Sequence, residues 1–96
     1  MAMLVKGEDE FIIKVDGRNA ARMQYIHSND YGMKGNVIII THTVVFETYK
    51  GKGYGRQLID ALVDYAREHD KKVEPQCPFA KVVFAKTPEI QDVLVK

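Results

Sequence analysis

The stretch Val44–Leu58, VVFETYKGKGYGRQL, decides how the rest of the chain is interpreted. An apolar, β-branched run, Val37–Val45, leads into it, and glycines follow at positions 51, 53 and 55. Because glycine has no Cβ, the backbone there can approach a ligand closely. The loop opens directly into an amphipathic pattern, and a helix N-terminus offers unpaired N–H groups and a positive dipole end. The stretch therefore predicts a strand, an anion-binding loop and a helix.

Two common nucleotide-binding loops do not match this stretch. A Walker A loop ends in Lys-Ser or Lys-Thr, whereas Arg56 and Gln57 stand at that point. The dinucleotide-binding fingerprint has two residues between its last two glycines, whereas Tyr54 alone separates Gly53 from Gly55. The pattern that remains is Lys-x-x-Gly-x-Gly at positions 50–55, placed between a strand and a helix.

Composition limits the class of protein and its partners. The chain has 96 residues, 46% hydrophobic and 28% charged, which predicts one globular domain over 1–96 with a modest core. The net charge is +1 and the basic residues are scattered, so we expect no nucleic-acid partner. No apolar run has the length of a membrane span or the character of a signal peptide, and a single cysteine cannot form an internal disulfide. We therefore expect a cytoplasmic protein without a membrane partner.

Before the glycine loop, the sequence predicts three strands in antiparallel succession. Phe11–Val15 alternates between two faces, and Asp16-Gly17 is a strong signal for a tight hairpin turn. The returning strand covers about 19–27, and a polar, glycine-containing loop follows over 28–36. The almost continuous apolar composition of Val37–Val45 indicates a central strand covered on both faces.

After the loop, a helix is predicted from about Gly53 to His69, with its apolar stripe at Leu58, Ala61, Leu62, Tyr65 and Ala66. A short strand over 72–76 should run parallel to Val37–Val45 through a right-handed crossover. Pro78 at a first helical position makes Cys77 the N-cap of a second helix that reaches about Lys86, with Phe79, Val82, Val83 and Phe84 as its apolar residues. Thr87 should cap a short terminal helix. These elements predict an α+β fold, with a mixed sheet (an antiparallel meander plus one parallel strand) and helices packed on it.

Cys77 is the most informative single residue. As an N-cap, its sulfur would lie at the positive end of a helix dipole, which favours a reactive thiolate. It also ends the parallel strand, near the edge where open α/β sheets bind ligands. However, free cysteine is among the most buried residue types, so simple packing in the core explains it equally well.

His42 interrupts the apolar run Ile38–Val45 and would need hydrogen-bond partners there. We favour a core histidine held by Thr41, Thr43 or water, and the alternative is a base or orienting group for Cys77. His27 and His69 are expected at the surface. Candidate bases among the acidic residues, ranked below these, are Asp9, Glu10 and Glu47. No group of Cys, His, Asp and Glu has metal-ligand spacing, so we predict no metal.

Together these motifs resemble the GNAT acetyltransferases, whose pyrophosphate-binding signature is Gln/Arg-x-x-Gly-x-Gly/Ala. Lys50 replaces the usual Gln or Arg, and Glu47 stands where many members carry proline. The chain is most similar to a subgroup of small, single-domain members with a His-Thr pattern before the glycine loop and Cys-Pro-Phe/Tyr after the next strand. Here these patterns are His42-Thr43 and Cys77-Pro78-Phe79.

The resemblance implies a site for acetyl-CoA between the diverging ends of strands 37–45 and 72–76. The amides of Gly51 to Arg56 would meet the pyrophosphate, and the backbone near Val44 and Val45 would pair with the pantetheine arm. The thioester would point at Cys77, so the implied catalytic residues are Cys77 and His42. The implied residues of the cofactor site are Val44, Val45, Lys50, Gly51, Lys52, Gly53, Tyr54, Gly55 and Arg56.

The implied activity is acetyl transfer from acetyl-CoA to a small-molecule or protein amine, either directly or through an acetyl-cysteine. Elements that build the acceptor pocket in longer family members are absent from the pattern, so a dimer partner or an open groove would complete it. The alternative function is a non-catalytic acyl-CoA-binding module that has lost its acceptor site. A monomer or a weak homodimer is compatible with either function.

Overall fold

The computed structural model describes residues 1–28 and 36–95, so most of the loop predicted over 28–36 lies outside the described residues. The elements in chain order are β1 (Ala2–Gly7), β2 (Glu10–Val15), β3 (Arg18–Ser28), β4 (Val37–Val45), the 3₁₀-helix η2 (Glu47–Tyr49), α1 (Tyr54–Glu68), β5 (Lys72–Pro75), α2 (Pro78–Lys86) and the 3₁₀-helix η3 (Pro88–Val93).

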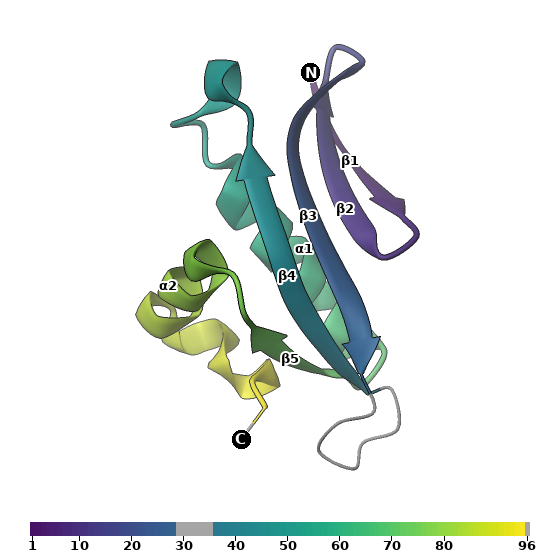
Figure 1. The fold of residues 1–96 in the computed structure, drawn as a ribbon, viewed down its shortest axis with the longest axis vertical. Helices are drawn as coiled ribbons and strands as arrows, with labels where there is room; N and C mark the ends of the chain where they lie inside the picture. Colours follow the sequence, from purple (N-terminus) through teal and green to yellow (C-terminus); the bar gives the residue numbers. More distant parts are fainter. Residues whose placement is uncertain (29–35, 96) are drawn as a thin grey trace.

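The strands form one sheet in the order β1-β2-β3-β4-β5. Neighbours from β1 to β4 pair antiparallel, and β5 pairs parallel with β4. In Figure 1, α1 lies behind the sheet, whereas α2 and η3 lie beside β5. This arrangement confirms the predicted α+β fold with a mixed sheet.

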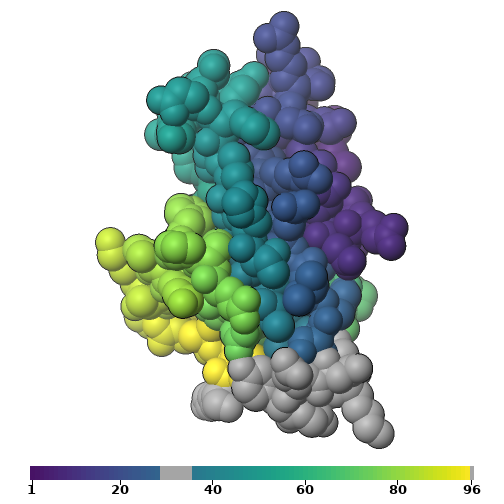
Figure 2. All heavy atoms as spheres, in the orientation of Figure 1, coloured from purple at the N-terminus to yellow at the C-terminus, as the bar shows by residue number. Residues whose placement is uncertain are grey.

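On the opposite face of the sheet, no helix from residues 1–28 or 36–95 covers the strands (Figure 1). In Figure 2, atoms of the segments coloured blue to teal, which belong to β3 and β4, form the surface in front. Ile26 on β3 is 49% exposed there, and Thr41 and His42 on β4 are exposed. The prediction that Val37–Val45 is covered on both faces is therefore wrong for the second half of this strand.

Strand β1 was not predicted, and it adds a fourth antiparallel strand at the edge of the sheet. It pairs with β2 over its whole length, from Ala2 opposite Val15 to Gly7 opposite Glu10. Most of its residues are exposed, including Met3 and Leu4. A strand with little burial on either face lacks the alternation of apolar and polar residues by which strands are recognised.

The core lies between the sheet and α1. The buried side chains of α1 are Leu58, Ile59, Leu62, Val63 and Ala66, and they join the buried residues of β2, β3, β4 and β5 in one cluster. Of the predicted stripe, Ala61 and Tyr65 are only partly buried, and Ile59 and Val63 take their places in the core. None of the helices in the described ranges is both long and apolar enough to cross a membrane.

A β-bulge divides β4 into two halves. Tyr25 of β3 lies opposite Ile40, but the preceding Gln24 lies opposite His42, so Thr41 is an extra residue in β4. Side chains that face each other across two strands share a face, and such a bulge reverses the alternation beyond it. Ile40 and Thr43 therefore both face the α1 side, opposite Tyr25 and Met23.

Strands β4 and β5 separate beyond the bulge. Their pairing ends at Ile40 opposite Pro75, and the carbonyl of Ile40 accepts hydrogen bonds from the amides of both Gln76 and Cys77. The second half of β4 then continues without a parallel neighbour among the described strands, while the chain after β5 turns into α2 (Figure 1). The separation of the two strands leaves space beside the second half of β4.

The C-terminal part differs in detail from the prediction. In α2, Ala80 and Phe84 are buried, whereas Phe79 and Val82 are 40% and 51% exposed. The terminal helix is a 3₁₀-helix, and Thr87 does not cap it with its side chain. Instead, the hydroxyl of Thr87 donates a hydrogen bond of 2.6 Å to the carbonyl of Val83. Thr87 follows α2 directly, so its hydroxyl is within reach of this α2 carbonyl and bonds to it instead of capping the 3₁₀-helix.

Candidate active site

The glycine loop connects the end of β4 to α1. Gly51 and Gly53 have φ angles of +82° and +80°, a left-handed conformation that favours glycine. Gly53 is the N-cap of α1, and no side chain forms a capping hydrogen bond there. The amides of the first turn, which the helix itself cannot pair, are therefore left for an anion from outside the helix.

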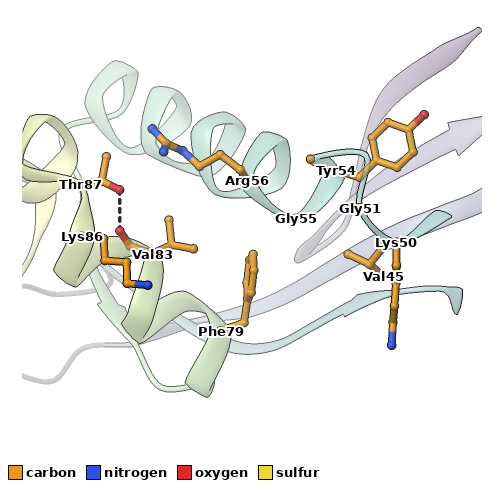
Figure 3. Close-up of a pocket in the computed structure, with 11 residues that line it drawn as sticks. Val45, Lys50, Gly51, Tyr54, Gly55, Arg56, Phe79, Val83, Lys86 and Thr87 are labelled. Atoms are coloured by element: carbon orange, nitrogen blue, oxygen red, sulfur yellow. Dashed lines mark hydrogen bonds between the residues drawn. The ribbon is translucent and has the colours of Figure 1, made fainter.

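A groove of about 420 Å³ lies between this loop and α2 (Figure 3). Its residues come from the end of β4, the loop, the first turn of α1 and the exposed side of α2. They are Val45, Lys50, Gly51, Gly53, Tyr54, Gly55, Arg56, Phe79, Val83, Lys86 and Thr87. Three of these side chains are cationic and none is acidic, so the groove favours an anionic ligand.

Phe79 stands in the middle of this groove, with its ring directed at Gly55 (Figure 3). A Cβ atom added to Gly55 would lie 2.6 Å from the Cζ atom of Phe79. Gly55 lacks the left-handed φ of Gly51 and Gly53. The glycine at position 55 is therefore needed for close packing against an aromatic ring, which is a different requirement from that at positions 51 and 53.

A second hollow of about 370 Å³ lies on the β4 side of Phe79. It is lined by Thr43, Val44, Val45, Lys50 and Phe79. Val45, Lys50 and Phe79 line both hollows, so the Phe79 ring lies at the boundary between the two spaces. The second hollow extends the first one along β4 as far as Thr43.

Cys77 lies just beyond Thr43. Its Sγ is 3.3 Å from the hydroxyl oxygen of Thr43 and accepts a hydrogen bond of 3.4 Å from the amide of Ala80. The predicted N-cap role of Cys77 is therefore confirmed. The residue is 7% exposed and belongs to the core cluster, so the packing interpretation also describes it.

His42 lies on the other face of the sheet. Successive residues of a strand point to opposite faces, and Thr43 is the one that meets Cys77. His42 lies opposite Gln24 on the face that none of the described helices covers, and it is exposed. The interpretation as a core histidine is wrong, because the bulge at Thr41 directs this side chain away from the core. Within residues 1–28 and 36–95, the imidazole of His42 has no hydrogen-bond or ion-pair partner.

The other predicted residues divide into two groups. Val44 lines the second hollow, and the remaining predicted cofactor residues line the first, except Lys52, which lines neither. The acidic candidates lie elsewhere: Glu10 pairs with Arg22 at 2.7 Å, Glu47 with Lys50 at 3.0 Å, and Asp9 is 3.7 Å from His27. Among the described residues, no three His, Cys, Asp or Glu side chains gather as a metal site would require.

Sequence reasoning missed Thr43, Phe79, Val83, Lys86 and Thr87 as residues of the site. The Cys-Pro-Phe motif contained a signal for Phe79, because it places an aromatic residue two positions after the thiol. Val83 and Lys86 follow Phe79 at positions i+4 and i+7, which lie on the same face of a helix. The helical spacing could therefore have extended the site along α2.

A family model described as GCN5-related N-acetyl-transferase matches residues 10–93 of this chain. The chain belongs to the GNAT family. This acyltransferase family was the one inferred from the glycine loop and from the His-Thr and Cys-Pro-Phe patterns, and that inference is confirmed. No curated protein gives a match to this GNAT chain.

Solved structures agree with this assignment. A GCN5-like protein from Staphylococcus aureus, solved by NMR, is 32% identical, with a TM-score of 0.76 over 97% of this chain and 87% of its own. An aminoglycoside N-acetyltransferase in complex with CoA is 17% identical, with a TM-score of 0.64 over 83% of this chain and 67% of its own. A Clostridium acetobutylicum structure with acetyl-CoA is 23% identical, with a TM-score of 0.59 over 80% of this chain and 54% of its own. The last two show the GNAT fold alone.

Proposed function

We propose that this domain transfers an acetyl group from acetyl-CoA to an amine, with Cys77 at the reacting end of the donor. The observation that carries the proposal is the run of adjoining hollows from the glycine loop to Thr43, whose hydroxyl oxygen is 3.3 Å from Cys77 Sγ. A donor with an anion at one end and a thioester at the other fits this order of groups. The family assignment supports the same reaction class.

The binding of the donor rests on the backbone of the loop and of α1. The uncapped first turn of α1 would hold the pyrophosphate, and Lys50 and Arg56 add positive charge beside it. Val44 and Val45 border the second hollow, where the pantetheine arm would lie along β4. The Phe79 ring would have to turn aside, or pack on the arm, to let the thioester reach Cys77.

The proposed chemistry uses Cys77 as a nucleophile. Bound acetyl-CoA supplies the acetyl thioester. The thiolate of Cys77 attacks the carbonyl carbon, a new C–S bond forms, and the old C–S bond breaks as CoA leaves as a thiolate. An acceptor amine then attacks the acetyl-cysteine, a C–N bond forms as the C–S bond to Cys77 breaks, and the proton lost by the amine restores the Cys77 thiol. The amide of Ala80 and the hydroxyl of Thr43 both lie within reach of the sulfur and would stabilise its charge.

Intact-protein mass spectrometry after incubation with acetyl-CoA tests this proposal. We expect one added acetyl group, which disappears in Cys77→Ala, while calorimetry finds CoA still bound to that variant. In the parent, CoA should also slow alkylation of Cys77 by iodoacetamide. Turnover with a panel of amines but no adduct would favour direct transfer. Binding with neither adduct nor turnover would favour the acyl-CoA-binding module, and absence of CoA binding would overturn the proposal altogether.

A further inference from the structure

Two cationic side chains line the outer end of the groove from opposite sides (Figure 3). Arg56 extends from the first turn of α1, and Lys86 is the last residue of α2 (Figure 3). Val83 lies between them and lines the same groove. Because helical side chains lean toward the N-terminus of their helix, the ammonium of Lys86 points back along α2 toward the body of the groove.

The charges at this end are not fully paired. Arg56 Nε is 2.8 Å from Asp60, which leaves the two terminal nitrogens of the guanidinium with no partner among the described residues. Lys86 forms no ion pair within residues 1–28 and 36–95, whereas Lys50 at the other end pairs with Glu47. With no acidic residue in the lining, this end of the groove carries an excess of positive charge toward the ligand.

The site at Lys86 is separate from the amides of the glycine loop. Phe79 faces Gly55 at the start of α1, and Lys86 follows Phe79 by seven residues. Seven residues of α-helix span about 10 Å. A phosphate at the loop amides therefore leaves room at the α2 end of the groove for a second anion near Lys86.

We propose that Lys86, assisted by Arg56, binds a phosphomonoester on the ribose of the donor and so selects CoA over carriers that lack a 3′-phosphate. The inference rests on the proposed function, because it assumes that the glycine loop holds the pyrophosphate. It adds a charged specificity determinant on α2 to a site in which the pyrophosphate is held by the glycine loop and α1. Carriers that would bind more weakly because they lack this contact include 3′-dephospho-CoA and protein-bound phosphopantetheine.

Calorimetric titration with CoA and with 3′-dephospho-CoA tests the inference. The parent should bind CoA about tenfold more tightly than 3′-dephospho-CoA, the effect of about one charge-assisted hydrogen bond. Lys86→Gln should weaken CoA binding by about the same factor and leave 3′-dephospho-CoA binding unchanged. Lys81→Gln is the matched control, because Lys81 is exposed on the same helix but lines neither hollow.

Two results would overturn the inference while leaving the proposed function intact. One is equal affinity of the parent for the two ligands. The other is an equal loss of affinity for both ligands in Lys86→Gln, which would assign Lys86 to the pyrophosphate. Failure of the parent to bind either ligand would reject the proposed function itself, and this inference with it. Lys86 is exposed, so Lys86→Gln should fold, and thermal melting checks that it does.

Discussion

Three glycines in one loop meet two different physical requirements. At Gly51 and Gly53 the backbone has a left-handed φ, and a Cβ at either position would have no atom within 4 Å. At Gly55 the backbone is helical, but a Cβ would press on the ring of Phe79. Substitutions at the first two positions therefore cost backbone strain, whereas a substitution at Gly55 acts through a neighbouring side chain.

Gly53→Val should reduce both stability and CoA binding. A β-branched residue at φ +80° is strained by about 1–2 kcal/mol, and relief of the strain would move the amides that start α1. Gly53→Asn is the control, since asparagine tolerates this conformation better. We expect thermal melting and CoA calorimetry to rank the parent first, Gly53→Asn second and Gly53→Val last. Equal CoA affinity in all three would remove the loop from the cofactor site.

Gly55→Ala should behave differently. At this second position of α1, alanine gains at most about 1 kcal/mol of helix propensity over glycine, and the half-exposed Phe79 ring can yield at its tip, so the melting temperature should change little. The displaced ring, however, should lower the affinity for CoA. Adding Phe79→Leu, which removes the Cζ atom, should restore binding, with Phe79→Leu alone as the reference. A double variant no better than Gly55→Ala would mean that the ring is not the cause.

At the scale of elements, one arginine fastens the C-terminal segment to α1. Arg67 donates to both carboxylate oxygens of Asp92, at 2.6 and 3.2 Å, and to the carbonyl of Glu89 at 2.8 Å. Lys72 of β5 donates to the carbonyl of Asp92 at 3.0 Å. Asp92 thus connects η3 to both α1 and β5. The connection matters for the site because η3 supports α2, from which Phe79 and Lys86 extend.

The hydrogen bond from Arg67 lowers the pKa of Asp92 below its ordinary value of 3.8. A lowered pKa in the folded state means that the stabilisation is complete above about 3.8 and is lost as the pH falls through the lower value. As the pH falls from about 5 to about 2, the melting temperature of the parent should fall more steeply than that of Asp92→Asn. The difference should be small and sensitive to salt, because both side chains are exposed. Glu68→Gln is the control, and parallel curves for parent and Asp92→Asn would contradict the prediction.

The elements that were predicted correctly are those whose side chains pack in the core. The alternation in β2, the apolar run of β4 and the stripe of α1 each report a contact with the core, so their positions were predictable. The bulge at Thr41 leaves no trace in composition, because β-branched residues stand on both sides of it. The contact of Thr43, rather than His42, with Cys77 depends on that bulge. It could not be inferred from a strictly alternating strand.

At the scale of the whole molecule, the strands of the sheet differ in how many neighbours protect their backbone amides from solvent. Strand β3 has neighbours on both sides, whereas β1 has one neighbour and an outer edge without a partner among the described strands. Family, fold and the chain order of the site followed from the sequence because they depend on local motifs. The uncovered face and the two-part groove did not, because they depend on which helices cover the sheet and on how far β5 extends.

Amide hydrogen exchange should report this difference in protection. Amides in the middle of β3 should exchange slowly, and those of β1 that point to the outer edge should exchange fast, because local opening at an edge costs little free energy. Two-dimensional NMR at low protein concentration measures both. Uniform protection along β1 would show instead that this edge is covered, and a concentration series would then test for a second copy of the chain.

The extra residue in β4 also limits how this site can change. Point substitutions alter which group occupies position 42 or 43, but they leave the direction of each side chain as it is. Straightening β4 with Thr41 kept in the ladder would pair Gln24 with Thr41 and Met23 with His42, and it would reverse the alternation of everything after Thr41. An imidazole would then face the sulfur in place of a hydroxyl, and Val44 would turn inward in place of Val45. Deletion of Thr41 would also remove the bulge, but it would keep the present pairing, so Thr43 would still face Cys77. The register of this strand, and not only the residue types in it, therefore decides between a cysteine beside threonine and a cysteine–histidine pair.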